Sequence, residues 1–225
     1  PNNIPMKAKK YLNVTLKGVQ ENDFAMILGY PGRTNRWVSS HWVDQQVKYG
    51  YPAWVEASKT AMDAMKAHMD KDKAVRLKYA SRYASLANYW KNRQGMIDAL
   101  TAHKTADLKR AAEKKFAVWA NKPENKAEYG NVLSDLATYF EKTNTLSADQ
   151  NYLGMLWRAS FFIKMPTRYI SLVSGAQRGG MPADELDKKV DNLLSEYDKI
   201  NLDVEKAILA DMLKLYANKG TDVPT

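Results

Sequence analysis

The sequence predicts a mainly α-helical fold: a domain of long antiparallel helices that follows a short N-terminal β-hairpin. From about residue 38 onward, apolar residues recur at the three- and four-residue spacing of amphipathic helices. Patterns typical of strands occur only in residues 11–30. Some helical stripes extend over about 30 residues, and helices this long bury their apolar faces by packing side by side with partners of similar length.

The hairpin is expected over residues 11–30. Leu12, Val14 and Leu16 alternate with polar residues, as in a half-buried strand. A polar loop over residues 17–23 separates this run from the apolar residues 24–28, and the turn-forming segment 29–32 follows. Because an isolated hairpin is only marginally stable in water, we expect it to belong to a larger sheet.

The helices follow in order, each with its own stripe and stop signal. The first stripe follows Pro52, which suits a first helical turn, and the longest begins near Lys73. A third reaches Trp119 and is stopped by Pro123. The apolar positions of these stripes are Val55, Met62, Met65, Met69; Tyr79, Tyr83, Leu86, Trp90, Ile97, Leu100; and Leu108, Ala112, Phe116, Trp119.

In the second half, Ser147 and Gln150 form a capping-box pattern that predicts a new helix start. Pro166 is expected to kink or end that helix, and a short helix over residues 167–174 and a glycine-rich loop over 175–180 to follow. A single last helix is expected from Pro182 to Gly220. The predicted organisation is therefore a hairpin segment (1–36), a helical domain (37–220) and a tail (221–225).

Composition excludes several classes of protein. The 225 residues are 45% hydrophobic and 26% charged, as in an ordinary soluble domain. No apolar run approaches the 18 residues that a transmembrane helix needs. Cysteine is absent, so the chain has no disulfide framework, cysteine metal ligand or thiol nucleophile.

The net charge of +9 is concentrated in the first half of the chain. Residues 1–120 hold 21 basic and 10 acidic residues, whereas residues 121–225 hold 13 basic and 15 acidic ones. A basic half is typical of nucleic-acid binding, but equally of a solvated face or of a face that meets an acidic neighbour. The run from Arg76 to Arg93 interleaves cations with aromatic rings, yet its helical spacing favours a packed core with cations outside.

No catalytic, metal or cofactor site is predicted from motifs. His41, His68 and His103 lie 27 and 35 residues apart, far from any metal-binding spacing. No Gly-x-Ser-x-Gly or phosphate-binding glycine loop occurs, and the neighbours Ser39, Ser40 and His41 are not expected to converge as nucleophile and base. The chain starts at Pro1 without an initiator Met and ends soon after a helix stop, so we expect a piece of a longer protein.

Two segments of the chain resemble a known enzyme family. They are ENDFAMILGYPGRT (residues 21–34) and VRLKYASRYASLANYWKN (residues 75–92), with a weaker match around residues 156–158. In this order and spacing they are similar to the bacterial serine dipeptidyl-peptidases of the dipeptidyl-peptidase 7 and 11 type. The resemblance implies a chymotrypsin-like double β-barrel with an inserted helical domain, and an enzyme that removes N-terminal dipeptides.

The resemblance also implies roles for the parts of this chain. The hairpin would be left over from the barrel, and the helical domain would cover the cleft of a periplasmic or secreted enzyme. The family's His and Asp lie upstream of these segments and its Ser downstream, so the chain by itself is expected to be inactive. Partners would be the barrel, a peptide with a free N-terminus and, in the parent, a second copy; nucleic acid, membrane and cofactors are not expected.

One residue role is carried over from the resemblance. Asn88 lies two positions from both Leu86 and Trp90, off the apolar stripe, and such helical amides are usually only solvated. In the family, the matching Asn helps to bind the α-amino group of the substrate, and an amide oxygen can accept from an ammonium. An acidic partner would come from the barrel. The alternative hypothesis is a basic helical module that binds an anionic partner such as nucleic acid.

Overall fold

The computed structural model describes residues 5–30, 32–178 and 182–221. Expectations that concern Pro31, Gly179, Gly180 and the tail residues 222–225 therefore lie outside the described residues. The chain divides into two units, residues 1–36 and residues 37–225, and each is described by itself below.

The N-terminal unit does not form the expected hairpin in its described residues. No strand occurs over residues 5–30 or 32–36, and large apolar side chains such as Leu16 and Ile27 are almost fully exposed. The loop between the two expected strands does turn: the amide of Asp23 donates to the carbonyl of Gln20 (3.1 Å), with Asn22 at a positive φ of 73°. The pairing fails because a lone hairpin has no further strand or core to cover its apolar face.

The second unit is helical, as expected. In chain order its elements are α1 Ser40–Gln45, the π-helical turn η1 Gln46–Gly50, α2 Tyr51–Met69, α3 Lys73–Ala102, α4 Thr105–Ala120, α5 Pro123–Tyr129, α6 Val132–Ala159, α7 Phe161–Gln177, α8 Ala183–Asp198 and α9 Leu202–Lys219. The interruption after α3 coincides with Lys104, which adopts a left-handed conformation (φ 47°).

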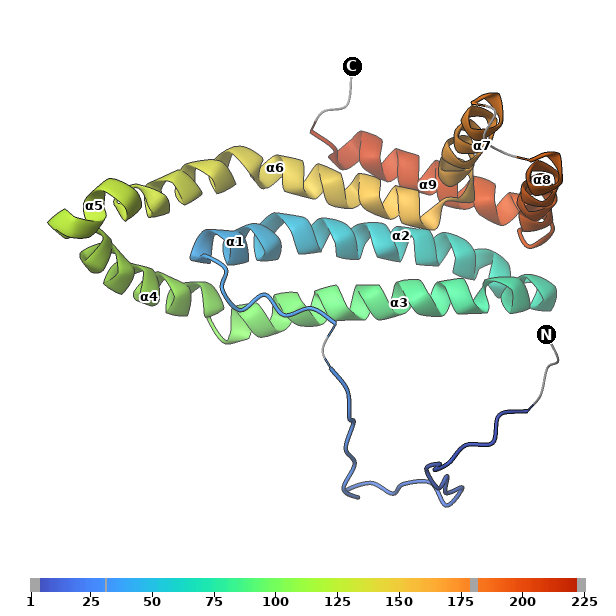
Figure 1. Cartoon of the computed structure of the whole chain (residues 1–225), viewed down its shortest axis with the longest axis horizontal. Helices are drawn as coiled ribbons and strands as arrows, with labels where there is room; N and C mark the ends of the chain where they lie inside the picture. The colour runs from blue at the N-terminus through green and yellow to red at the C-terminus, as the bar shows by residue number, and fades with distance from the viewer. Residues whose placement is uncertain (1–4, 31, 179–181, 222–225) are drawn as a thin grey trace. The chain divides into compact units, whose positions relative to one another are not determined.

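Helix α2 is the centre of the arrangement and contacts α3, α6 and α9 (Figure 1). Helix α3 runs antiparallel to α2, and α9 runs antiparallel to α6. Helix α6 instead runs in the same direction as α2, because α3, α4 and α5 return the chain to its starting end (Figure 1). The long helices therefore pack side by side as expected, but not every neighbouring pair is antiparallel.

The main core lies between these helices. Its fully buried side chains come from α2, α3, α6 and α9 and include Met65, Tyr79, Met155, Ile208 and Met212. A smaller cluster of Phe161, Met165 and Leu193 joins α7 to α8. The apolar stripe predicted for α3 faces this core: Tyr79 and Leu86 are buried in it, and Tyr83 and Trp90 pack at its edge.

Close packing of α6 against η1 corrects the capping-box prediction. Ser147 is not a helix cap but lies inside α6, facing Gly50. A Cβ atom at Gly50 would lie 3.1 Å from Ser147 Oγ and 3.3 Å from Asn151 Nδ2, so glycine allows the two backbones to approach. The capping-box prediction was wrong because Ser147 lies within α6 and packs against Gly50 of η1, a tertiary contact that the local pattern does not contain.

Two helix boundaries also differ from the predictions. The helix break falls at Ser160, whose hydroxyl accepts from the amide of Ile163 (3.4 Å), while Pro166 lies inside α7. The expected single helix over 182–220 is divided into α8 and α9 at Asn201, whose side chain accepts from the amides of Asp203 and Val204. At the first place the buried carboxylate of Glu205 accepts from the amide of Phe161, and at the second it is linked to Asn201 through the hydroxyl of Tyr79.

Glu205 connects three parts of the helical unit through a buried set of polar contacts, here called the Glu205 network. Its carboxylate is fully buried and accepts from the guanidinium of Arg82, from the hydroxyl of Tyr79 (2.8 Å) and from the amide of Phe161 (3.0 Å). Arg82 also donates to the carbonyl of Ala159. The network therefore joins α3 and α9 to the junction between α6 and α7.

Tyr79 extends the network to the start of α9. Its hydroxyl accepts from the amide of Asn201 (3.0 Å), the residue that caps α9. Burial, and to a lesser extent the hydrogen bond to Glu205, raise the pKa of Tyr79 well above its ordinary value, against the opposing effect of the Asn201 backbone. Tyr79 therefore keeps its proton and remains a donor to the carboxylate.

We predict that Arg82→Met destabilises the chain by about 3–5 kcal/mol, because it leaves the buried Glu205 carboxylate without its cation. Lys59→Met is the matched control, since it breaks an exposed pair with Asp63 (2.5 Å) and is expected to cost less than about 1 kcal/mol. Urea unfolding followed by circular dichroism measures both. Equal and small losses in the two variants would contradict the role given to the network.

Candidate functional site

Helix α3 presents Asn88 on its outer face. Successive residues on an α-helix are rotated by about 100°, so Asn88 lies about 200° from Leu86, which faces the core. The Asn88 side chain is exposed, and its amide makes no hydrogen bond to any other described residue. Its donor and acceptor are therefore free to bind a ligand, as the sequence-based hypothesis requires.

The two aromatic residues after Asn88 fix the rotation of this part of α3. Trp90 packs against the core, and its indole nitrogen is buried without a hydrogen-bond partner among the described residues. Tyr89 is half-exposed and meets Trp54 of α2 edge to face, with ring centroids 6.4 Å apart. Both residues act as packing, which agrees with the interpretation from the sequence.

Beside Tyr89 lies a cluster of rings and cations that the sequence did not reveal as a unit. It is here called the arginine–aromatic patch and consists of the buried Tyr51 and of Trp54, Tyr89, Arg93 and Arg158. The guanidinium of Arg158 lies 4.6 Å from the Tyr89 ring centroid, and that of Arg93 lies 4.9 Å from Tyr51. Neither arginine pairs with a carboxylate within the described part of the chain. The patch was not predicted as a unit because α2, α3 and α6 each contribute to it. Its partial signals in the sequence were the Arg76–Arg93 run, which contains Tyr89 and Arg93, and the weak match at residues 156–158.

Three cations of the Arg76–Arg93 run bind other residues of the helical unit. Lys78 donates to the carbonyl of Asp198 (2.9 Å), and Arg76 pairs with Asp70 (3.0 Å). Arg82 belongs to the Glu205 network. These contacts give the run a structural function in holding α3 to its neighbours.

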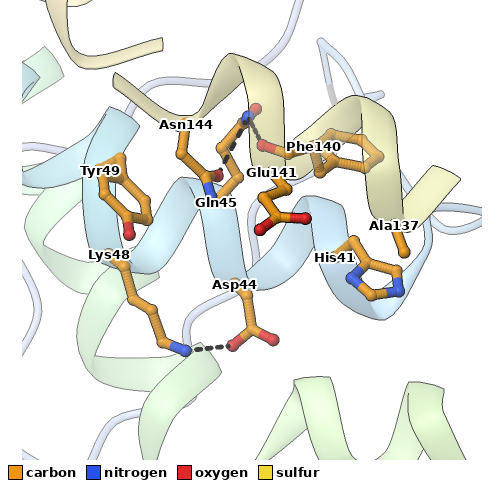
Figure 2. A pocket seen from close by; sticks show the side chains of 9 residues that line it. All are labelled: His41, Asp44, Gln45, Lys48, Tyr49, Ala137, Phe140, Glu141 and Asn144. Atoms are coloured by element: carbon orange, nitrogen blue, oxygen red, sulfur yellow. Dashed lines mark hydrogen bonds and ion pairs between the residues drawn. The ribbon is translucent and has the colours of Figure 1, made fainter. Parts of the chain in front are cut away.

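A groove of about 320 Å³ lies between α6 and the helical turns of α1 and η1 (Figure 2). Gln45 links α1 to α6 in this groove, with Nε2 donating to Thr143 Oγ1 (3.0 Å) and to Asn144 Oδ1 (3.4 Å). Figure 2 shows the lining side chains: His41, Asp44, Gln45, Lys48, Tyr49, Ala137, Phe140, Glu141 and Asn144. The π-helical turn η1 begins here, and such turns are frequent next to functional sites.

The groove does not hold a nucleophile–base pair made from the neighbours Ser39, Ser40 and His41. Ser39 caps α1 by accepting from the amide of Trp42 (3.2 Å). Ser40 is buried and donates twice to Glu113, from its amide and from its hydroxyl, both at 2.6 Å. His41 contributes to the groove wall without contacting either serine hydroxyl, which agrees with the expectation that these residues do not converge.

Asp44 is the most strongly held charge of the groove. It pairs with Lys48 (3.2 Å) and with Arg110 of α4 (2.6 Å). Burial raises the pKa of Asp44, but the hydrogen bonds from Arg110 and Lys48 outweigh that effect and hold its pKa below the ordinary value. Asp44 therefore stays ionised and joins α1 to α4.

Within residues 5–30, 32–178 and 182–221, no group of three or more His, Asp or Glu side chains is arranged to hold a metal ion. Over the same residues, no helix combines the length and hydropathy needed to cross a membrane.

The profile of the peptidase S46 family matches residues 1–224 of the chain. The chain belongs to the peptidase S46 family. This finding agrees with the resemblance inferred from residues 21–34 and 75–92.

The curated relatives are dipeptidyl-peptidases by name. The chain is 74% identical to "Dipeptidyl-peptidase 7" of Capnocytophaga gingivalis over 100% of its own length and 32% of the relative. It is 30% identical to "Dipeptidyl-peptidase 7" of Phocaeicola vulgatus (96% of the chain, 30% of the relative). It is 31% identical to "Asp/Glu-specific dipeptidyl-peptidase" of Flavobacterium psychrophilum (97% and 31%). The chain thus spans about a third of the length of these relatives.

We predict that Asp44→Asn lowers the free energy of unfolding by about 0.5–1 kcal/mol at pH 7, because the pairs with Lys48 and Arg110 are lost. Since the folded-state pKa is lowered, this stabilisation is present above the unfolded carboxyl pKa and is lost as the pH falls through the folded one. Wild type and variant should therefore converge in acid when chemical unfolding is measured from pH 7 to pH 2. The Arg110→Met background should shrink the difference; a constant offset at every pH would contradict the assignment.

Proposed function

We propose that the chain is the helical cap domain of a serine dipeptidyl-peptidase. Its function is to cover the active-site cleft, to restrict substrates to peptides with a free N-terminus, and to help bind the α-amino group of the substrate. The observation that supports this most directly is the Asn88 amide: it is exposed, unpartnered among the described residues, and held on a helix whose rotation is fixed by Tyr89 and Trp90. The names of the relatives support the reaction class.

The chemistry of amine recognition suits an asparagine on a rigid helix. An α-amino group has a pKa near 8 and is mostly an ammonium at neutral pH, so it donates hydrogen bonds and accepts none. The amide oxygen of Asn88 can accept one of these bonds. A neutral acceptor alone gives modest affinity, so we infer that a carboxylate from the barrel supplies the remaining contact.

The catalytic residues belong, in this proposal, to a barrel outside the chain. There the nucleophilic Ser attacks the peptide carbonyl, the His acts as base, and water hydrolyses the acyl-enzyme. We propose that residues 11–16 and 24–28 form two strands of that barrel, where neighbouring strands would cover the apolar side chains that are exposed here. The 225 residues alone would then be inactive.

The proposal also includes a location and a state of assembly. The parent enzyme is proposed to be periplasmic or secreted in a bacterium and to have the potential to form a homodimer. Names of both the "Dipeptidyl-peptidase 7" and the "Asp/Glu-specific" kind occur among the relatives that match this chain at similar identity. We infer that the barrel, and not the helical cap, selects the side chain next to the cleaved bond.

We predict that Asn88→Ala in the full-length parent lowers kcat/KM for a free-amine dipeptidyl substrate by about tenfold to a hundredfold, which corresponds to about 1.4–2.8 kcal/mol. The residual hydrolysis of the same substrate with a blocked amine should be unchanged, because the lost contact concerns the amine only. Steady-state assays of both substrates measure the difference.

Asn92→Ala is the matched control for this experiment, since Asn92 lies one helical turn further along the same exposed face of α3. It should leave both substrates unaffected. Equal activity of Asn88→Ala and wild type on the free-amine substrate would exclude amine recognition by Asn88 and leave the cap with steric closure only. A wild-type parent that cleaves no dipeptidyl substrate would exclude the proposed enzyme itself.

A further inference from the structure

A small cavity of about 190 Å³, here called the basic cavity, lies where α7 meets α3 and α8. It is lined by Arg82 of α3, by Phe161, Lys164, Met165 and Arg168 of α7, and by Glu196 of α8. Pockets that bury drug-sized ligands measure about 300–1,000 Å³, so this cavity suits a single small group. Its lining, with three cations and one carboxylate, determines which kind of group that is.

The carboxylates near the cavity are already paired with arginines. Glu196 binds Arg168, and Glu205 binds Arg82 from the far side. Lys164 has no carboxylate within ion-pair distance among the described residues; its ammonium donates one hydrogen bond, to the carbonyl of Arg158 (2.6 Å). An ammonium has three donors, so two remain for a ligand.

The surroundings of Lys164 disfavour its positive charge. Burial lowers the pKa of Lys164, and the positive charges of Arg82, Arg168 and Arg158 lower it further, with only Glu205 acting in the opposite direction. The first turn of α7 adds the positive end of a helix dipole, because Phe161 is the first residue of that helix. An anion in the cavity would supply the missing counter-charge.

We propose that the basic cavity binds a small oxyanion, a phosphate or a carboxylate group, through the ammonium of Lys164 and the guanidinium of Arg168. Arg82 contributes positive charge at the back of the cavity, while its donors stay with Glu205 and the carbonyl of Ala159. Charge-assisted hydrogen bonds of this kind are about twice as strong as neutral ones. The inference is independent of the peptidase proposal, since it uses only the helical unit.

The test is isothermal titration of the 225-residue chain with inorganic phosphate and, separately, with acetate, at constant ionic strength set by chloride. One saturable site is expected. Binding of phosphate alone identifies a phosphate-group site, and binding of both anions identifies a site that also takes carboxylates. If wild type shows no saturable binding of either anion, the proposal is overturned.

Lys164→Met is expected to weaken binding at least tenfold. Lys188→Met is the matched control, because Lys188 is an exposed lysine of α8 that does not line the cavity. Lys188→Met should bind the anions as tightly as wild type does. Any general stabilisation of the folded state by phosphate acts equally on this variant, so it does not account for a difference from Lys164→Met. Should Lys164→Met fail to fold, Lys164→Gln provides the same comparison. A Lys164 variant that binds both anions as tightly as wild type would overturn the proposal.

Thermal unfolding provides a second readout that a purely structural lysine would not give. Without anion, Lys164→Met should melt no lower than wild type, because it removes a partly buried charge from beside three arginines. With phosphate, the melting temperature should rise more for wild type and Lys188→Met than for Lys164→Met. Equal increases in all three proteins would contradict a site at Lys164.

Discussion

A buried carboxylate must have its hydrogen bonds satisfied, and this requirement on Glu205 determines much of the helical unit. Its oxygens accept from α3 through Tyr79 and Arg82 and from the start of α7 through the amide of Phe161. Burying an ion pair adds little net stability, because the loss of hydration offsets the attraction between the charges. A buried carboxylate whose cation is displaced, however, strongly destabilises the folded state. The Glu205 network therefore specifies which arrangement of α3, α9 and the α6–α7 junction is acceptable, while the apolar core supplies most of the stabilisation.

The same network orients the candidate site. Asn88 follows Arg82 by six residues, about 9 Å along α3, so fixing Arg82 against Glu205 also fixes the direction of Asn88. Tyr89 and Trp90 hold the rotation from the other side. The network also borders the basic cavity, which Arg82 lines while its donors bind Glu205. Lys164 in the same lining has no carboxylate partner among the described residues. The Arg82–Glu205 pair thus helps to position both Asn88 and the lining of the basic cavity.

Local periodicity predicted the helical class, the start of α3 at Lys73 and the exposed place of Asn88, because these depend on residues within a few turns. Three predictions were wrong: a single helix over 182–220, a helix kink or end at Pro166, and a helix start at Ser147. The observed break at Asn201, the end of α6 at Ala159 and the place of Ser147 each involve a partner far along the chain, which is Tyr79, Arg82 and Gly50 respectively. The strands over residues 11–30 require a sheet that the described residues do not provide. The arginine–aromatic patch and the basic cavity combine residues from three helices, which no sequence pattern joins.

A crystal structure of the full-length parent with a dipeptide product bound tests the central claim most directly, because it locates the amino group relative to Asn88. The account predicts that the Asn88 amide oxygen lies within hydrogen-bond distance, about 2.7–3.2 Å, of the α-amino nitrogen, with a carboxylate from the barrel on the same nitrogen. It also predicts that residues 11–16 and 24–28 are paired strands there. An Asn88 side chain that faces solvent, away from the product, would contradict the account.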